Sequence, residues 1–232
     1  MRKLLCGAAA LVLTLVAVLA FIYNTGAGQD ALFSRAAQML LAPAPPSPDG
    51  LRVVVCGSAS PAGNDPDRAQ ACIAVVTPEH FFLVDVGARS PQRIAQARLP
   101  VGRLDGVLLT HFHSDHIAGL PDVNLASWVQ GRRSSLKVHG PKGVGVVVAG
   151  FNLAYSLDRG YRVAHHGPEL LAPPAGPMTA IESGPGEVVW QDGLMTIRSF
   201  AVDHAPIDPD VGYRLDYRGR SFHKQVFGQD CL

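Results

Sequence analysis

The sequence predicts a mixed α/β fold of layered sheets and helices, beginning near residue 51. Short apolar, β-branched runs alternate with turns rich in glycine, proline and aspartate, which is the pattern of β-strands. A helical segment at 91–98, with Pro91 in its first turn, interrupts the strands. The 232 residues, 47% of them hydrophobic, suffice for one domain with a full core but not for two ordinary ones. This order of strands, helix and strand is typical of a layered α/β domain.

The first half of the predicted domain contains four strands. Residues 52–56 (RVVVC) form the first, and a loop rich in Gly, Pro, Asn and Asp follows it. Residues 72–77 and 80–87 form the next two, separated by a Pro-Glu turn. After the helix, the continuous apolar character of 107–110 predicts a buried strand.

The second half carries weaker patterns. Helical spacing favours helices within 117–129 and 144–157, and residues 136–141 indicate a strand between them. The proline and glycine content of 165–186 predicts a long loop. Three further strands are expected at 187–190, 194–204 and 212–222.

The first 23 residues are predicted to form a transmembrane anchor. Arg2 and Lys3 precede the uncharged run 4–23, which is about as long as a helix that crosses ~30 Å of hydrocarbon. A cleaved signal peptide is the alternative, because 18–20 (VLA) resembles a cleavage site, but the apolar run exceeds the ~7–15 residues typical of signals. We favour a single-pass anchor with the domain on the extracytoplasmic side. Under the alternative, the domain would be secreted or periplasmic.

The remaining chain divides at a proline-rich linker. Residues 24–50 would form a juxtamembrane segment that ends in the linker 42–50, and residues 51–232 would form the domain. Cys56 and Cys72 lie at the end of one predicted strand and the start of the next, so a hairpin could join them. An exported domain could hold them as a disulfide, and two separate core thiols are the alternative.

The overall charge does not favour a nucleic-acid partner. The formal net charge is +1, only 17% of the residues are charged, and the basic residues are scattered. No basic surface that would bind phosphate backbones is therefore predicted. Together with the expected export, the charge argues against nucleic acid as a partner.

A cluster of metal-ligand residues follows the predicted strand 107–110. His111, His113, Asp115 and His116 fall within six residues. On an extended backbone His111 and His113 point the same way and could reach one cation, while the other two follow where the chain must turn. Neutral imidazole and carboxylate are ligands of zinc and related divalent ions. The cluster therefore predicts a metal site at the mouth of a buried strand.

The segment THFHSDHIAGLPD resembles the signature of the metallo-β-lactamase superfamily, and more narrowly of its ribonuclease Z-like branch. The segments VVVCGSASP followed by Arg68, FFLVDVG, and FAVDHAPIDPDVGYRLDYRGRSF are similar to other parts of that branch. The resemblance spans about residues 51–222. It implies the αββα sandwich of that superfamily and a metal-dependent hydrolase.

The resemblance also implies roles for individual residues. His111, His113 and His204 would hold a first metal, and Asp115 and His116 would belong to a second, with Asp115 also taking part in catalysis. Asp85 would orient one of the ligands or brace the loop. Zinc would be the metal, with two ions in the family, and manganese is the alternative. His165 and His166 could line a substrate cleft, and a solvated loop is the alternative for them.

The sequence departs from the family pattern after residue 222. An aspartate in an SGDT-like turn and a distant histidine are expected there, whereas the sequence reads HKQVFGQDCL, with Asp230 in an unpatterned tail. We expect the sandwich to be incomplete at the C-terminus through truncation or a frameshift. The first metal ion would then be held more firmly than the second.

Three functions follow as expectations. The first is hydrolysis of a phosphodiester or related small ester by a zinc-activated water. Sulfate-ester hydrolysis is an alternative that suits an extracytoplasmic enzyme, whereas precursors of transfer RNA are cytoplasmic. A non-catalytic or weakly active membrane-anchored metal-binding remnant is the alternative from another class.

Overall fold

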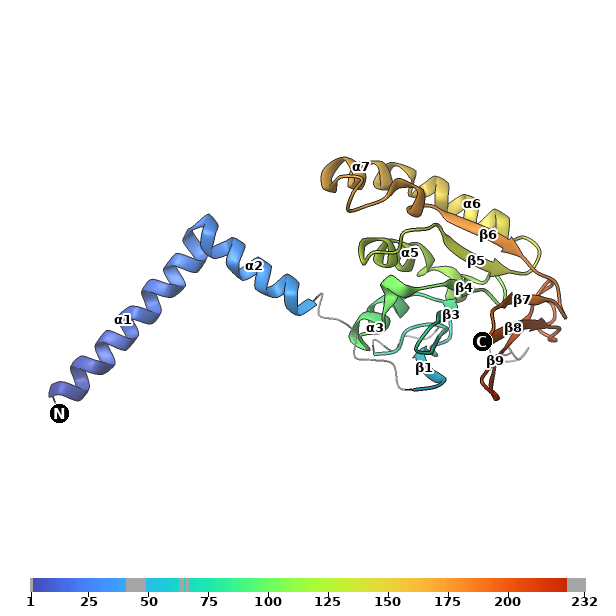
Figure 1. Cartoon of the computed structure of the whole chain (residues 1–232), viewed down its shortest axis with the longest axis horizontal. Coiled ribbons are helices and arrows are strands. Elements are labelled where there is room, and N and C mark those ends of the chain that lie inside the picture. The colour runs from blue at the N-terminus through green and yellow to red at the C-terminus, as the bar shows by residue number, and fades with distance from the viewer. Residues whose placement is uncertain (1, 41–48, 63–64, 66, 225–232) are drawn as a thin grey trace. The chain divides into compact units, whose positions relative to one another are not determined.

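The computed structural model describes residues 2–40, 49–62, 65 and 67–224 (Figure 1). The chain divides into two compact units, 1–44 and 45–232, and each is described by itself. The predicted linker 42–50 lies largely outside the described residues, as does Asp230.

The N-terminal unit consists of two helices, α1 (Arg2–Asn24) and α2 (Gly26–Leu40). Thr25 separates them: its hydroxyl donates to the carbonyl of Phe21 at 2.7 Å and accepts from the backbone N–H of Gly28 at 3.0 Å. Among the described residues, no single helix has the length and apolar character of a membrane span. The pair Leu11–Asn24 and Gly26–Leu32, bent by 91°, meets both requirements only when taken together.

The second unit contains two sheets. The first has six strands whose order in the sheet follows the chain: β1 Arg52–Gly57, β2 Cys72–Val76, β3 Phe81–Val86, β4 Gly106–Leu108, β5 Leu136–Gly140 and β6 Met178–Glu182. The pairs among β1, β2 and β3 are antiparallel, and those from β3 to β6 are parallel. The second sheet is antiparallel, in the order β10 (Arg220–Lys224), β9 (Gly212–Tyr217), β8 (Met195–Phe200) and β7 (Val188–Gln191).

Helices connect the parallel strands. They are α3 (Ser90–Gln96), α4 (Ser114–Ile117), α5 (Leu120–Val129), α6 (Val144–Ala154) and α7 (Ser156–His166), with short 3-10 turns at Val101–Arg103 and Pro173–Ala175. Side chains of α3, α5 and α6 such as Ile94, Val123 and Val148 share one core with Leu83 and Val107 of the first sheet. These helices therefore cover one face of that sheet.

The opposite face of the first sheet packs against the second sheet. Phe82, Val84 and Leu108 form a second core with Ile197 and Tyr213. All five of these side chains are fully buried. The unit therefore stacks helices, sheet and sheet, and the described residues after β7 contain no helix.

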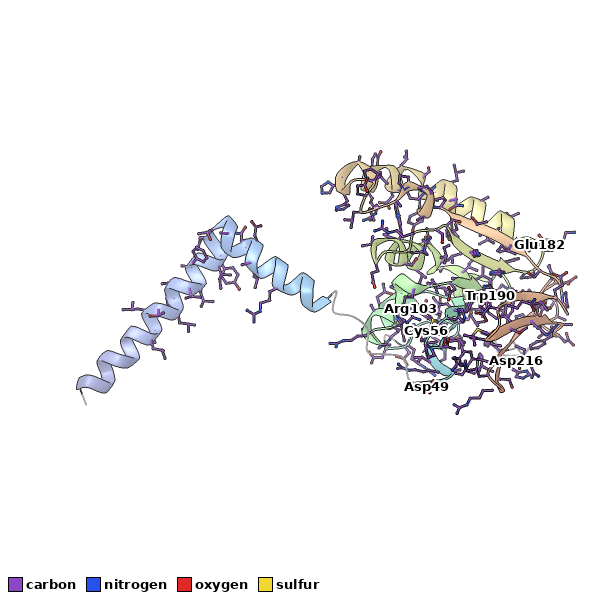
Figure 2. The ribbon with its side chains drawn as sticks, viewed as in Figure 1. Asp49, Cys56, Arg103, Glu182, Trp190 and Asp216 are labelled. Carbon is purple, nitrogen blue, oxygen red and sulfur yellow. A yellow bond between two sulfur atoms is a disulfide. The ribbon has the colours of Figure 1, made fainter. Side chains whose placement is uncertain are left out.

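One aromatic contact joins the sheets where β3 begins. Trp190 of β7, labelled in Figure 2, meets Phe82 edge to face with ring centroids 5.1 Å apart. His80 also contacts Trp190 and places its Nε2 atom 2.7 Å from a carboxylate oxygen of Asp192. The contact of Trp190 with Phe82 therefore packs β7 of the second sheet against the beginning of β3 in the first sheet.

The structure corrects three predictions of secondary structure. The expected loop 165–186 contains the end of α7 and strand β6, because parallel pairing with β5 orders a segment that proline and glycine would leave irregular. The expected strand 107–110 ends at Leu108. The expected strand 212–222 is a hairpin, since Arg218 and Gly219 turn the chain with positive φ.

Cys56 and Cys72 form a disulfide between the first two strands, with their Cα atoms 4.9 Å apart. Both cysteines are buried. The pair ties β1, the edge strand of the first sheet, to β2 and closes a short loop of the chain. The structure therefore contains the predicted disulfide and not two separate core thiols.

Arg132 is buried behind α5, and its guanidinium donates to neutral oxygens of the surrounding loops and helix. It donates to Asn124 Oδ1 at 2.7 Å, to Ser127 Oγ at 2.9 Å and to the carbonyl of Ala175 at 2.9 Å, and it also bonds the carbonyl of Ser134. Burial lowers the pKa of Arg132 to about 10, so the group stays charged at neutral pH. This network fixes the segment that leads into β6.

We expect the double substitution Cys56→Ser with Cys72→Ser to lower the free energy of unfolding by about 3 kcal/mol, because the open chain gains loop entropy when it unfolds. Urea denaturation of the full chain measures the change. The parent protein in dithiothreitol should fall to the value of the double variant. Equal stability of oxidised parent and double variant would contradict the role of the bridge.

We expect Arg132→Ala to destabilise the fold by roughly 3 kcal/mol, because several buried oxygens lose their donor at once. Arg133→Ala is the matched control, because Arg133 is exposed and its guanidinium donates to one carbonyl, that of Glu169. The control should change stability by less than about 0.5 kcal/mol. Similar losses in both variants, measured by urea denaturation, would show that the buried network is not the cause.

Candidate metal centre

The histidine cluster lies just beyond the carboxyl end of β4. The chain leaves the sheet after Leu108, and His113 is the N-cap residue of α4. The neighbouring parallel strands β3 and β5 end at the same edge of the sheet. The site is therefore at the edge where open α/β sheets bind their ligands.

Three histidines converge there, the set that the family resemblance implies for one metal. The Nε2 atom of His111 lies 3.1 Å from the Nδ1 atom of His113. His204 joins them, with its ring centroid 4.8 Å from that of His111, and one nitrogen from each residue lies within 4.8 Å of the other two. His111 and His204 are buried and His113 is half-buried.

His204 reaches the cluster from the second sheet. It lies in the connection between β8 and β9, where its carbonyl accepts the N–H of Ile207 at 3.0 Å. The same connection is tied to the first sheet, because Val211 N–H donates to the carbonyl of Thr110 at 3.0 Å. Packing of the two sheets therefore brings His204 to the residues that follow β4.

The environment of His111 favours its neutral form. Burial is the main cause that lowers its pKa to about 3, and the neighbouring His116 lowers it further. Neutral imidazole is the form that binds metal ions. His111 is thus a ready metal ligand throughout the neutral pH range.

Asp85 holds the adjacent His116. Its carboxylate accepts from the backbone N–H of Thr110 at 2.9 Å and from the Thr110 hydroxyl at 3.0 Å, and its Oδ2 atom lies 3.0 Å from His116 Nδ1. Burial disfavours the charged form of His116, but the Asp85 and Asp115 carboxylates together outweigh it, so the pKa of His116 is raised. Carboxylate–histidine pairs of this kind orient histidines in metal sites.

Asp115 lies on the other side of His116. Its Oδ2 atom is 3.4 Å from His116 Nε2, and both side chains are buried. The rings of His111 and His116 are 4.1 Å apart at their centroids, so the pair adjoins the three-histidine group. Within the described residues, the only group of three or more ligands that could hold an ion is His111, His113 and His204.

Thr110 is a residue of the site that the sequence analysis missed. Its hydroxyl lies 3.1 Å from His111 Nδ1 and 3.4 Å from His116 Nδ1 while it donates to Asp85. Thr110 is the one polar residue at the end of the apolar run 107–110, and this position could have identified it from the sequence. Tyr213 was also missed: it donates from the second sheet to the carbonyl of Leu109 at 2.9 Å.

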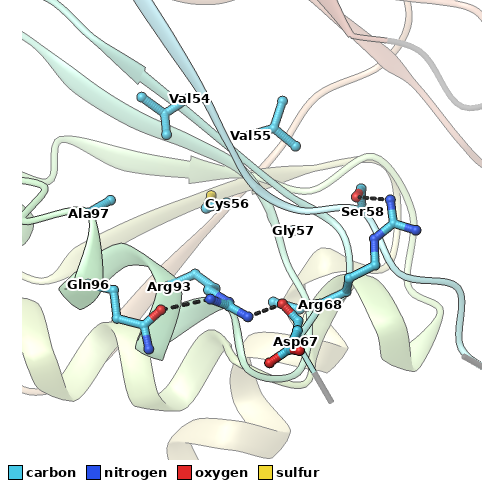
Figure 3. A pocket seen from close by; sticks show the side chains of 11 residues that line it. Val54, Val55, Cys56, Gly57, Ser58, Asp67, Arg68, Arg93, Gln96 and Ala97 are labelled. Carbon is cyan, nitrogen blue, oxygen red and sulfur yellow. Dashed lines mark hydrogen bonds between the residues drawn. The ribbon is translucent and has the colours of Figure 1, made fainter. Parts of the chain in front are cut away.

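His165 and His166 lie apart from the described cavities. They end α7 and are exposed, with ring centroids 4.6 Å apart, so the expected loop around them is wrong. A cavity of about 430 Å³ lies beside β1 and α3 instead (Figure 3). Arg93 bonds Gln96 at its rim, and none of the predicted metal ligands lines it.

The donor set fits a divalent metal ion. Two nitrogens bound tetrahedrally to zinc lie about 3.3 Å apart, close to the separation of His111 and His113. Three imidazoles at a sheet edge leave a fourth position open for water, as in catalytic zinc sites. The arrangement can therefore hold one metal ion that activates water.

Comparisons with known proteins agree with this geometry. A family model described as the metallo-beta-lactamase superfamily matches residues 65–221. Curated relatives named ribonuclease Z include one from Mycobacterium bovis, 38% identical over 74% of this chain and 60% of its own length, and one from Mycobacterium marinum, 40% identical over 74% and 61%. The chain thus spans about 60% of the length of these relatives.

Solved structures show the same fold at low identity. The metallo-beta-lactamase fold protein YhfI of Bacillus subtilis has a TM-score of 0.53 at 18% identity, covering 75% of this chain and 61% of its own. The short form of human tRNase Z has a TM-score of 0.52 at 18% identity, covering 75% and 67%. The predicted resemblance to the ribonuclease Z-like branch is confirmed by the curated relatives, and the chain belongs to the metallo-β-lactamase superfamily.

Proposed function

We propose that this protein is a zinc-dependent hydrolase that cleaves a phosphodiester or related ester. The observation that carries the proposal is the convergence of His111, His113 and His204, whose nitrogens lie within 4.8 Å of one another. Membership of the metallo-β-lactamase superfamily supports a hydrolase. Manganese is the alternative metal for the same donors.

The residues of the site would divide the work as follows. His111, His113 and His204 would hold the ion, which would make water nucleophilic near neutral pH and stabilise negative charge on the leaving group. Asp115, buried beside His116, is placed to accept a hydrogen bond from the attacking water and to orient it. Asp85 and Thr110 keep His116 in position beside that carboxylate.

We propose that one ion is bound more firmly than a second. Asp115 and His116 supply only two ligand groups beyond the three-histidine group, and Asp85 already engages one nitrogen of His116. Two ligands hold a cation weakly compared with three. A metal-binding remnant without catalysis is the competing function, and it predicts the same ion without turnover.

The proposed substrate class depends on the names of the curated relatives and on the net charge of the chain. The curated relatives carry the name ribonuclease Z, which favours a phosphodiester. The net charge of +1 gives no support for a long nucleic acid. We therefore propose a small phosphodiester, with a sulfate ester as the second candidate.

We also propose that the domain works outside the cytoplasm. The disulfide between Cys56 and Cys72 supports an oxidising compartment. The uncharged run 4–23 supports an N-terminal anchor or signal. Arg133 is exposed, so labelling of an Arg133→Cys variant with a membrane-impermeant maleimide, in intact and in opened cells, would test this placement.

Metal analysis tests the site. We expect the purified full chain, dialysed against zinc, to retain one ion by mass spectrometry of the metal content. His113→Ala should weaken zinc binding more than about 100-fold, because a donor of the three-ligand set is lost. His165→Ala, an exposed histidine outside the cluster, should bind as the parent does. Two tightly held ions per chain would exclude the one-ion proposal.

Turnover separates the hydrolase from the remnant. We expect the zinc-loaded chain to release nitrophenol from bis(p-nitrophenyl) phosphate faster than from p-nitrophenyl sulfate. Asp115→Asn should lower kcat by at least about 100-fold, because the carboxylate that orients water is lost. His165→Ala again serves as the control. One bound ion with no turnover of either ester would identify a metal-binding remnant.

A further inference from the structure

Lys224, the last residue of β10, faces the first sheet. It pairs with Tyr213 of β9, and Phe222 pairs with Leu215. Directly opposed residues of an antiparallel pair share one face of the sheet, as do alternate residues along a strand. Tyr213, Leu215 and Phe222 all pack in the core between the two sheets. Lys224 therefore continues the row of side chains that points toward the first sheet.

The end of β10 that carries Lys224 lies at the candidate metal centre. Tyr213, its partner in register, donates from its hydroxyl to the carbonyl of Leu109 at 2.9 Å. Two residues before Tyr213, the backbone N–H of Val211 donates to the carbonyl of Thr110, which directly precedes the histidine cluster. The inward-facing row of β10 thus ends with an ammonium beside the segment that leads into the histidines.

The charge of Lys224 acts on the buried imidazole beside Asp115. Burial and the Lys224 ammonium lower the pKa of His116, against the carboxylates of Asp85 and Asp115 that raise it. Lys224 is half-buried, and within the described residues it forms no ion pair with a carboxylate. A partly buried ammonium without a counter-charge favours the binding of an anion.

An anionic ester would need a positive charge on this side of the site. The buried carboxylates of Asp85 and Asp115 repel an approaching phosphoryl oxygen, and only Asp115 and His116 remain there as ligands for a second ion. Lysine binds phosphate oxygens as a compact point charge on a flexible stem. An ammonium in this position would offset the repulsion without a second metal.

We propose that Lys224 binds a negatively charged oxygen of the ester and thereby selects anionic over neutral substrates. The inference rests on the proposed hydrolase and names the residue that would recognise its substrate class. The ligand is a tetrahedral oxyanion, either phosphoryl or sulfuryl. Arg220 offers a comparison within the same strand, because it is an exposed cation in the same row at the end away from the metal centre.

Binding of inorganic phosphate tests the proposal without turnover. The zinc-loaded full chain is titrated by isothermal calorimetry, with sulfate titrated in parallel to show which oxyanion binds more tightly. Lys224→Met keeps the length of the stem and removes the charge, so the Kd for phosphate should rise at least about tenfold. Lys224→Arg should stay within about threefold of the parent. Arg220→Met should bind as the parent does, and the zinc content should be the same in all variants.

Turnover supplies a second measurement. In Lys224→Met the KM for bis(p-nitrophenyl) phosphate should rise at least about tenfold while kcat changes less than about threefold, because the charge holds the ester before and during bond cleavage alike. The KM for p-nitrophenyl acetate, a neutral ester, should not change. An equal rise of KM for both esters would contradict selection by charge.

Failure of this proposal and failure of the proposed function give different results. Phosphate binding that depends on Lys224 in a chain without turnover would support the anion site and exclude the hydrolase. Three results would overturn the anion site: an equal phosphate Kd in parent and Lys224→Met, an equal loss in Arg220→Met, or no measurable phosphate binding by the zinc-loaded parent. Loss of zinc from Lys224→Met would also overturn it, because the lysine would then support the metal ligands and not the substrate.

Discussion

The Asp85 carboxylate is the interaction on which the site depends. Asp85 is the penultimate residue of β3 and has a left-handed conformation, with φ of 58°. From there its carboxylate binds the backbone and hydroxyl of Thr110 and the imidazole of His116. Three segments that are separate in sequence, the end of β3, the end of β4 and helix α4, therefore meet on one buried carboxylate. A buried carboxylate without such partners would be costly, so the network that positions the histidines also stabilises the fold.

Much of this arrangement could be predicted from local sequence, because local patterns carry it. The β-branched runs locate β1, β2 and β3, and the spacing of His111, His113, Asp115 and His116 locates the site. The remainder depends on tertiary contacts. Strand β6 exists because β5 offers it a parallel partner, and Thr110 joins the site because Asp85 folds back onto it.

The helical spacing within 144–157 illustrates a different limit. Such spacing identifies a helix with an apolar side, and it is usually taken to mean burial. Here Val144 and Val148 face the sheet while Val146 and Leu153 face solvent, since the helix is apolar on more than one side. Periodicity alone does not tell which of two apolar sides meets the core, and only the packing of α6 on β5 and β6 decides it.

The origin of His204 in the second sheet links metal affinity to folding. His111 and His113 both follow β4, whereas His204 reaches them from the connection between β8 and β9, which is bonded to the first sheet through Val211 and Thr110. By thermodynamic linkage, an ion that prefers three ligands to two stabilises the docked sandwich by its excess binding free energy. An ion bound there would tether the two sheets, at the opposite end of the strands from the contact of Trp190 with Phe82.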